Sequence, residues 1–356
     1  MNTLEKEKKI PVGIIGATGY AGVELAALIN KHPNFELTAL ASHGSAHTTL
    51  GSHYPQLEAE LGNQELCTVS ELLAQDLALV FLAVPHTTAL ETVAQLRAKN
   101  VRVVDLSADY RLKDSAVYQA YYGVSHTHPH LLMQAVYGLT EWSRSRVAEA
   151  GLVANPGCYP TASALACLPA CSAKIVDLNQ TIVVSAVSGF SGAGKKACDS
   201  KGYALTDENV TSYKPLVHQH VPEIKQTIQD IAQTATLNLA FTPHIASYKR
   251  GIFASCFIPL KDEVTEQTIK TVYREAYAGE PFIELLPYGE MPHITQVVGT
   301  NKAYIGCAFD ADSHQLYVAC AIDNLVKGAA GQALQNANVM FGLEETTGLK
   351  TKAEVI

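Results

Sequence analysis

Short apolar runs and helical repeats alternate along the first third of the chain. Four runs are rich in Val, Ile and Leu and predict buried strands, at residues 12–16, 35–42, 77–85 and 101–107. Residues 20–32 carry apolar side chains at three- and four-residue intervals and predict a helix. Thr88 and Glu91 have the spacing of a capping box, which predicts another helix starting there. Because strands that alternate with helices form right-handed crossovers, the pattern predicts a Rossmann-type, doubly wound parallel sheet.

The pattern changes after about residue 155. Strand-like runs now follow one another with few helices between them, at residues 181–189, 237–246, 250–260 and 304–322. This arrangement predicts a second, α+β domain built on a largely antiparallel sheet. The tail from residue 323 is helical in pattern and rich in Ala and Gly. We therefore expect one domain from residues 1–154 plus a C-terminal helix at 324–356, and a second from residues 155–323.

Composition and charge narrow the class of protein. The 356 residues include 26 basic and 34 acidic side chains, a formal net charge of −8, which disfavours nucleic acid as a partner. The charged start lacks the apolar core of a signal peptide, and no apolar run is long enough for a membrane span. The eight cysteines lack the short-spaced pairs of secreted proteins. We expect a soluble, cytoplasmic protein with free thiols, no metal, and neither nucleic acid nor membrane as partner.

Four glycines cross the first strand-to-helix turn: Gly13, Gly16, Gly19 and Gly22. A phosphate that binds a helix N-terminus needs exposed backbone N–H groups, which side chains would block. The spacing differs from the common NAD fingerprint, and the alternative is a tight structural turn. Its place at the first strand–helix junction favours a dinucleotide site. The second strand ends at Ser42 without an acidic residue for the ribose 2′-hydroxyl, which favours NADP(H) over NAD.

Cys158 is the candidate nucleophile, because a Pro-Gly precedes it and a Tyr-Pro follows it. A helix expected from about Thr161 would direct its positive end at the thiol and, with a histidine partner, prime Cys158 for reaction near neutral pH. His218 and His220 are the candidate partners, expected to share one face of an extended segment. A surface loop and a metal site are the alternatives for this pair. The other seven cysteines are expected to fill the core.

Seven motifs occur in order along the chain: GATGYAG, DLSADYRL, YGL, NPGCYPT, VSGFSGAG, HQHVPEI and DNLVKGAAGQ. With them the chain closely resembles the N-acetyl-γ-glutamyl-phosphate reductases, relatives of aspartate-semialdehyde dehydrogenase. The resemblance covers essentially the whole chain. It implies reversible, NADPH-dependent reductive dephosphorylation of N-acetyl-γ-glutamyl phosphate to N-acetyl-L-glutamate 5-semialdehyde in arginine biosynthesis. It also implies a thioester on Cys158 and a homo-oligomer, dimer or tetramer.

The resemblance also implies roles for residues outside the cysteine motif. The catalytic histidine is His218 or His220. The expected cofactor-binding residues are Gly16, Thr18, Gly19, Tyr20, Gly22, Ser42, Pro85, Ser188, Gly189 and Asn324. The chain departs from the family after the second strand, where basic residues are common and this sequence has ASHGSAHTT, and at Thr140, where proline is usual. The first departure weakens the expected preference for NADP.

An anionic substrate needs local positive charge in a protein that is acidic overall. The candidate substrate-binding residues are Arg111, Lys195, Lys214 and Arg250. Two alternatives to the implied function stay open. One is the same chemistry on aspartyl phosphate or on a carrier-linked aminoadipyl phosphate. The other is a non-catalytic Rossmann module that senses NADP and binds partners.

Overall fold

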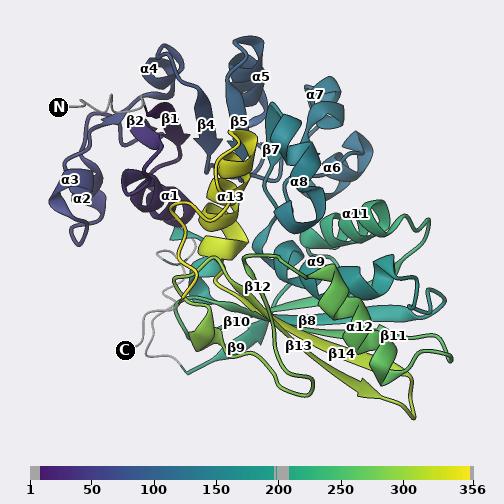
Figure 1. Ribbon diagram of the computed structural model, residues 1–356. Helices are drawn as coiled ribbons and strands as arrows, with labels where there is room; N and C mark the ends of the chain where they lie inside the picture. The colour runs from purple at the N-terminus through teal and green to yellow at the C-terminus, as the bar shows by residue number, and fades with distance from the viewer. Residues whose placement is uncertain (1–8, 196–197, 199–207, 353–356) are drawn as a thin grey trace, which may run out of the picture.

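The computed structural model describes residues 9–195, 198 and 208–352. Within them the chain forms two seven-stranded sheets, one above the other in Figure 1. The charged segment at residues 1–8, Lys196 of the Ser/Gly loop and residues 353–356 of the expected C-terminal helix lie outside the described residues. The two sheets confirm the expected pairing of a Rossmann-type parallel sheet with a largely antiparallel one.

The first sheet is parallel throughout, in the order β3-β2-β1-β4-β5-β7-β6. Its strands are β1 (Ile10–Ile15), β2 (Phe35–Ala41), β3 (Leu66–Cys67), β4 (Leu79–Leu82), β5 (Arg102–Asp105), β6 (Val136–Tyr137) and β7 (Leu152–Ala154). Buried side chains form an apolar core on each face of the sheet. The strand order reverses between β1 and β4, which is where ligands bind in open sheets of this kind.

Helices cover both faces of the first sheet, as the doubly wound pattern requires. One core is shared with α1 (Tyr20–Asn30), α8 (Thr140–Glu149) and α13 (Gly331–Met340). The other is shared with α4 (Val69–Leu73), α5 (Leu90–Ala98) and α7 (Pro129–Gln134). The remaining helices of this half are α2 (Leu50–His53), α3 (Ala59–Gly62) and α6 (Ser115–Tyr122). The C-terminal segment therefore packs against the first sheet, and its helix ends at Met340, earlier than the expected 324–356.

The capping box expected at Thr88 and Glu91 is wrong. Helix α5 begins at Leu90 without a side-chain cap, and the Thr88 hydroxyl donates to the Pro85 carbonyl at 2.7 Å. The carboxylate of Asp109 instead accepts the backbone N–H groups of Thr87 at 2.6 Å and of Ala89 at 2.8 Å. Asp109, which follows the neighbouring strand β5 (Arg102–Asp105), therefore stabilises the turn before α5. The spacing of residues within the turn gives no sign of this contact.

The second sheet has the order β12-β13-β14-β11-β8-β10-β9. Its strands are β8 (Thr181–Gly189), β9 (Val210–Ser212), β10 (Asn238–Ala246), β11 (Ile252–Pro259), β12 (Ile283–Leu285), β13 (Ala303–Asp310) and β14 (Gln315–Ile322). Four neighbouring pairs are antiparallel, and β8–β10 and β12–β13 are parallel. Three helices pack on one face through a single apolar core: α9 (Cys158–Ser172), α11 (His220–Ala232) and α12 (Glu266–Ala276).

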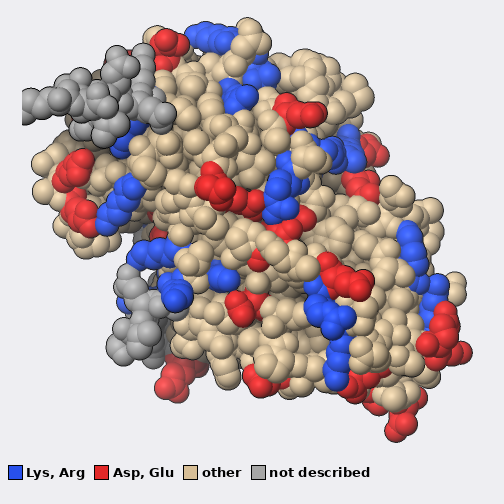
Figure 2. Space-filling model, viewed as in Figure 1, with Lys and Arg blue, Asp and Glu red and all other residues tan. Residues whose placement is uncertain are grey.

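The surface shown in Figure 2 mixes the two signs of charge, with basic and acidic side chains interspersed over both halves of the molecule. Among the described residues, no helix combines the length and the apolar character that crossing a membrane requires.

Candidate functional site

A cleft of about 1300 Å³ opens where the first sheet meets the N-terminus of α9. It is lined by most of the residues that the sequence singled out: Gly16, Thr18, Gly19, Tyr20, Ser42, Pro85, Arg111, Cys158, Lys195, His220 and Asn324. The other candidates do not line it: Gly22, Ser188, Gly189, His218, Lys214 and Arg250. The glycine turn and the candidate nucleophile therefore share one cavity, although Gly16 and Cys158 are 142 residues apart in sequence.

The glycine turn lies at one end of the cleft and is closely packed. Gly16 has φ 91°, which favours glycine, and an added Cβ would collide with the carbonyl of Ala83 at the end of β4. Gly19 is the N-cap of α1, so the first N–H groups of that helix face the cleft beside Thr18 and Tyr20. Gly22 supports the turn from behind, because a Cβ there would collide with the Gly16 carbonyl. Bare backbone at a helix start fits a dinucleotide phosphate.

Polar side chains gather where β2 ends. The hydroxyls of Ser42 and Thr18 are 2.7 Å apart, and the Tyr54 hydroxyl donates to the Thr18 carbonyl at 2.9 Å. Lys195 comes from the Ser/Gly loop of the second half and places its ammonium 4.3 Å from the centre of the Tyr54 ring. Lys195, expected near the substrate, therefore lies at the end of the cleft where a Rossmann fold holds the adenosine ribose.

Cys158 occupies the other end of the cleft as the first residue of α9, three residues earlier than expected. Two glycines allow the chain to close around it. A Cβ on Gly328 would lie 2.8 Å from the Cβ of Cys158, and a Cβ on Gly157 would lie 2.7 Å from Nε2 of His220. His220 therefore approaches the residue just before Cys158, and Gly328 packs against the Cα and Cβ of Cys158 from the segment that follows β14.

A buried ion pair, which the sequence did not reveal, holds this part of the cleft. Glu223 and Arg111 are 1% and 5% exposed, and their side chains pair at 3.3 Å. Glu223 also accepts the N–H of Gly157 at 2.8 Å and the hydroxyl of Tyr137 at 2.9 Å. Arg111 donates to the carbonyls of Leu106 and Asn155 beyond β5 and β7, at 2.6 and 2.8 Å. The pair therefore joins two strand ends to the start of α11 directly beneath Cys158.

The two histidines do not share an extended segment, so that expectation is wrong. His220 is the first residue of α11, and its N–H donates to Nδ1 of His218 at 3.1 Å. The ring of His218 packs among Tyr159, Tyr213 and Phe241, with centroids 5.3–6.1 Å away. His220 lines the cleft, and its Nδ1 has no hydrogen-bond partner among the described residues. Of the two rings, only that of His220 faces the cavity.

Burial controls the protonation of these groups. It lowers the pKa of His218 to about 4, with the Lys214 charge acting in the same direction, and it lowers the pKa of His220 well below the usual range. Burial also raises the pKa of the Cys158 thiol to about 11, which the Tyr159 N–H and the Arg111 charge offset only in part. The expectation that the helix start primes the thiol near neutral pH is therefore wrong for the free protein. Neutral His220 is available to accept its proton.

The rate at which Cys158 reacts with iodoacetamide should rise about tenfold per pH unit from pH 7 to pH 10, without a plateau below pH 9. The reason is that a pKa near 11 leaves only a small fraction of thiolate in this range. Mass spectrometry of the labelled peptides measures the rate, with the half-buried Cys67 as internal reference. A plateau between pH 6 and 8 would instead reveal a preformed thiolate–imidazolium pair.

The remaining candidates have other neighbours. Arg250 pairs with Glu24 at 2.9 Å and with Asp323 at 3.1 Å beside a second cavity of about 460 Å³. Lys214 is exposed and donates to the side chain of Gln219 at 3.2 Å. The charge of Arg250 is therefore already compensated, whereas Lys214 forms no ion pair with the acidic side chains that the structure describes.

The Ser/Gly loop and the C-terminal segment meet at Asn324. Its side chain accepts the N–H of Gly251 at 2.7 Å and donates to the Ser191 hydroxyl at 3.0 Å. Ser191 and Gly192 line the cleft, whereas the buried hydroxyl of Ser188 donates to the Gly189 carbonyl at 2.9 Å behind them. The sequence indicated Ser188 and Gly189 as the part of the loop that lines the cleft. In the structure Ser191 and Gly192 line it instead.

His86 also lines the cleft and was not predicted. Its Nδ1 accepts the N–H of Ala108 at 3.1 Å, so the neutral ring carries its proton on Nε2. The signal available in the sequence was its position just after a buried strand, where functional side chains of open sheets gather. Neither His86, His218 nor His220 belongs to a potential metal-binding group within the described residues; the one such group is Glu141, Glu280 and Glu345.

Comparisons with known proteins agree with this geometry. Residues 11–150 match the NAD binding domain of the semialdehyde dehydrogenases, and residues 158–324 match their dimerisation domain. The chain is 42% identical over 341 residues to the N-acetyl-gamma-glutamyl-phosphate reductase of Halothermothrix orenii, covering 96% of this chain and 98% of that protein. It is 42% identical over 346 residues to the enzyme of that name from Alkalilimnicola ehrlichii, covering 97% and 99%.

Solved structures share the fold at low identity. Aspartate semialdehyde dehydrogenase II from Vibrio cholerae has a TM-score of 0.71 and 16% identity, over 94% of this chain and 99% of that one. The enzyme from Candida albicans, solved with NADP, has a TM-score of 0.66 and 15% identity over the same shares of the two chains. The chain therefore belongs to the N-acetyl-gamma-glutamyl-phosphate reductases, within the semialdehyde dehydrogenase family.

Proposed function

We propose that this protein reduces N-acetyl-γ-glutamyl phosphate to N-acetyl-L-glutamate 5-semialdehyde and phosphate with NADPH, reversibly, in the cytoplasmic biosynthesis of arginine. One observation carries the proposal. A single cleft joins a glycine turn suited to a dinucleotide with a cysteine at a helix start and a neutral histidine beside it. The relatives of the same name, at 42% identity, support the choice of substrate.

In the proposed mechanism His220 takes the proton of Cys158 as the sulfur attacks the acyl-phosphate carbonyl. Backbone N–H groups in the first turn of α9 stabilise the oxyanion, since they point out of the helix start toward the reacting carbonyl. The C–O bond to phosphate breaks, and the acyl group stays on sulfur as a thioester. The glycine turn and the Ser/Gly loop would hold the nicotinamide cofactor, which would supply the hydride that reduces this thioester. His220 returns its proton to the sulfur as the aldehyde leaves.

Anionic substrate groups need donors in the same part of the cleft. We propose Arg111 and Lys214 for this role, together with Nε2–H of His86. The Lys214 charge is close enough to lower the pKa of His218, and Arg111 lines the cleft beside Cys158. Arg250 is left out, because it lies beside the second cavity, where it pairs with Glu24 and Asp323.

The assay that tests the function is phosphate-dependent reduction of NADP⁺ with N-acetylglutamate semialdehyde. Parallel reactions contain aspartate semialdehyde, aminoadipate semialdehyde on its carrier, or no phosphate. We expect turnover only with N-acetylglutamate semialdehyde and phosphate together. Faster turnover of another aldehyde reassigns the substrate, and turnover of none supports the NADP-sensing alternative.

NADPH is proposed as the cofactor in preference to NADH. The support is the polar end of β2, where Ser42 and the Lys195 ammonium lie near the expected position of the ribose 2′-phosphate. The cofactor site would include Gly16, Thr18, Gly19, Tyr20, Pro85, Ser191, Gly192 and Asn324, all of which line the cleft.

Replacing Lys195 with alanine should raise the KM for NADPH by about three- to tenfold and leave the KM for NADH unchanged. The reason is that NADPH carries the 2′-phosphate that the Lys195 ammonium would bind, whereas NADH lacks it. Steady-state kinetics with both cofactors measure the difference, and Lys249→Ala, an exposed lysine outside the cleft, is the matched control. Equal kcat/KM for NADPH and NADH in the unmodified protein would contradict the preference itself.

The division of labour between the two halves is also a proposal. Residues 1–154 with the segment 324–356 would hold most of the cofactor. Residues 155–323 would supply Cys158, His220, the Ser/Gly loop that completes the cofactor site, and the subunit contact. The sheet face opposite α9, α11 and α12 exposes apolar side chains, with Val183 and Phe257 each 41% exposed. Such a face, within a match to a dimerisation domain, supports a homo-oligomer.

A further inference from the structure

A π-helical turn at Val326–Ala330, η3, connects the two ends of the cleft. Its wide ring is closed by hydrogen bonds from the N–H of Gly328 to the carbonyl of Asp323, and from the N–H of Ala330 to that of Leu325, both at 2.8 Å. Turns of this kind are rare and occur mostly at functional sites. Here the turn follows Asn324, which contacts the Ser/Gly loop, and precedes α13.

The turn touches the nucleophile loop at two successive residues. Gly328 lies so close to Cys158 that a methyl group on it would be 2.8 Å from the Cys158 Cβ and 3.2 Å from its Cα. The carbonyl of Ala329 accepts the side-chain N–H of Asn155 at 3.2 Å. Asn155 begins the three residues between β7 and Cys158. Any shift of the turn is therefore transmitted to the position of the thiol.

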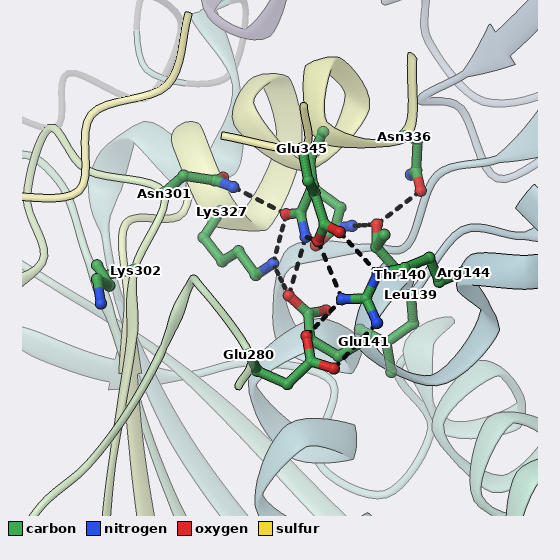
Figure 3. A network of polar contacts seen from close by, with 12 residues as sticks. Leu139, Thr140, Glu141, Arg144, Glu280, Asn301, Lys302, Lys327, Asn336 and Glu345 are labelled. Carbon is green, nitrogen blue, oxygen red and sulfur yellow. Dashed lines mark hydrogen bonds and ion pairs between the residues drawn. The ribbon is translucent and has the colours of Figure 1, made fainter. Parts of the chain in front are cut away.

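Lys327, between Asn324 and these contacts, is the only charged residue of the turn, and it points inward. Its side chain is fully buried, and Nζ lies 2.5 Å from Oε1 of Glu141 on α8 and 2.7 Å from Oε1 of Gln335 on α13. Figure 3 shows Lys327 reaching into this group of polar side chains. Gln335 in turn donates to Glu141 at 3.1 Å and accepts the amide of Asn301 at 2.8 Å. The ammonium is thus fixed by partners on two helices.

The pair is ionic despite its burial. Removal from water would raise the pKa of Glu141, but the Lys327 charge and the hydrogen bonds from Lys327 and Gln335 lower it below its ordinary value. An apolar side chain would fill this space at no cost in desolvation. What a charged pair adds is a large penalty for separation, because moving the ammonium away would leave a buried carboxylate without its compensating charge.

We propose that Lys327 is a positioning residue for the nucleophile: its buried ion pair with Glu141 holds η3 so that Gly328 packs on Cys158. The inference rests on the proposed function only in that it takes Cys158 as the reacting group. Lys327 itself acts through the turn, since it is not among the residues that line the cleft.

The outer half of the same network provides a matched control. Arg144 forks between Glu280 and Glu345, at 2.5 and 2.6 Å, and its side chain is 40% exposed (Figure 3). It shares the carboxylate of Glu345 with Gln335 but forms no hydrogen bond or ion pair with η3 among the described residues. Losing Arg144 therefore weakens the network without releasing the turn.

The test compares Lys327→Met with Arg144→Met, each assayed well below its own Tm. Methionine keeps most of the unbranched apolar stem of either side chain but removes the charge. For Lys327→Met we expect kcat to fall about 10- to 100-fold, since small displacements of reacting groups have effects of this size. We also expect Cys158 to react about tenfold faster with iodoacetamide, because a loosened Gly328 exposes the thiol and burial no longer raises its pKa as far. For Arg144→Met we expect a lower Tm with kcat and alkylation rate within threefold of the parent.

A merely structural role predicts a different pattern. The proposal is overturned if kcat of Lys327→Met stays within threefold of the parent, if Arg144→Met loses as much kcat, or if Cys158 alkylates no faster than before. Should Lys327→Met not fold, Glu141→Gln is judged by the same criteria, since it removes the charge but keeps an acceptor for Lys327. Alkylation needs no substrate, so the proposal is decided even if the parent protein turns over none of the aldehydes.

Discussion

Replacing Cys158 with serine should lower kcat by on the order of 10⁴-fold or more and leave cofactor binding intact. Serine has nearly the same size, so the contact with Gly328 and the start of α9 should survive. Its hydroxyl, however, is a far weaker nucleophile than the thiolate and a poor leaving group from the reduced intermediate. Steady-state turnover of N-acetylglutamate semialdehyde and fluorescence titration with NADPH measure the two effects separately.

Cys67→Ser is the control for this variant. Cys67 is half-buried at the end of β3, and kcat should stay within about twofold when it is replaced. A Cys158→Ser protein that keeps turnover would remove the thioester from the mechanism. A parent protein that binds NADPH but turns over no aldehyde, with or without Cys158, would be the NADP-sensing module instead.

The parts of the fold that the sequence predicted are those in which local pattern and burial agree. β1 and β4 are continuous apolar runs, because helices cover both faces of the parallel sheet. The Pro-Gly before Cys158 indicated a constrained backbone, and the structure places Gly157 against His220 and Arg111 where a side chain would not fit. Such features can be predicted from sequence because each depends on the residues of one short segment.

Helix starts were misjudged for a local reason. Both α9 and α11 begin two residues before a proline, at Cys158 and His220. The residue before proline usually avoids helical geometry, which favoured an extended segment there. Proline is nevertheless tolerated in the first turn, because the N–H that it lacks has no partner inside the helix. Tertiary contacts decide between a helix start and an extended segment before such a proline. Here the deciding contact is that of the buried Glu223 carboxylate with the N–H of Gly157.

The contacts that assemble the site join segments far apart in sequence. Arg111 meets Glu223, and Gly328 meets Cys158, across more than a hundred residues in each case. No periodicity links such partners, so Glu223 and Gly328 were not predicted as parts of the site. The burial of Cys158 likewise depends on segments that are distant in sequence. The sequence placed Cys158 at a helix start, but only the packed structure shows that desolvation raises the pKa of its thiol to about 11.

The choice between the two histidines follows from these contacts. We propose His220 as the acid–base group, because it lines the cleft beside Gly157 while His218 packs among aromatic rings. His220→Asn should lower kcat by a factor on the order of 10²–10⁴ and remove one limb of the pH profile. His218→Asn should cost less than about tenfold, since the asparagine oxygen can still accept the N–H of His220.

Stability against pH gives a second measurement that needs no substrate. A histidine whose pKa is lowered in the folded state binds its proton more readily after unfolding, so stability decreases as the pH falls below about 6.5. Each buried histidine should contribute up to about 1.4 kcal/mol of this loss per pH unit. Both asparagine variants should therefore show a shallower decline in the free energy of unfolding between pH 6.5 and 5, whereas only His220→Asn should lose turnover. If neither variant loses more than about tenfold in kcat, the acid–base group is another residue, and His86 is the next to replace because it lines the same cleft.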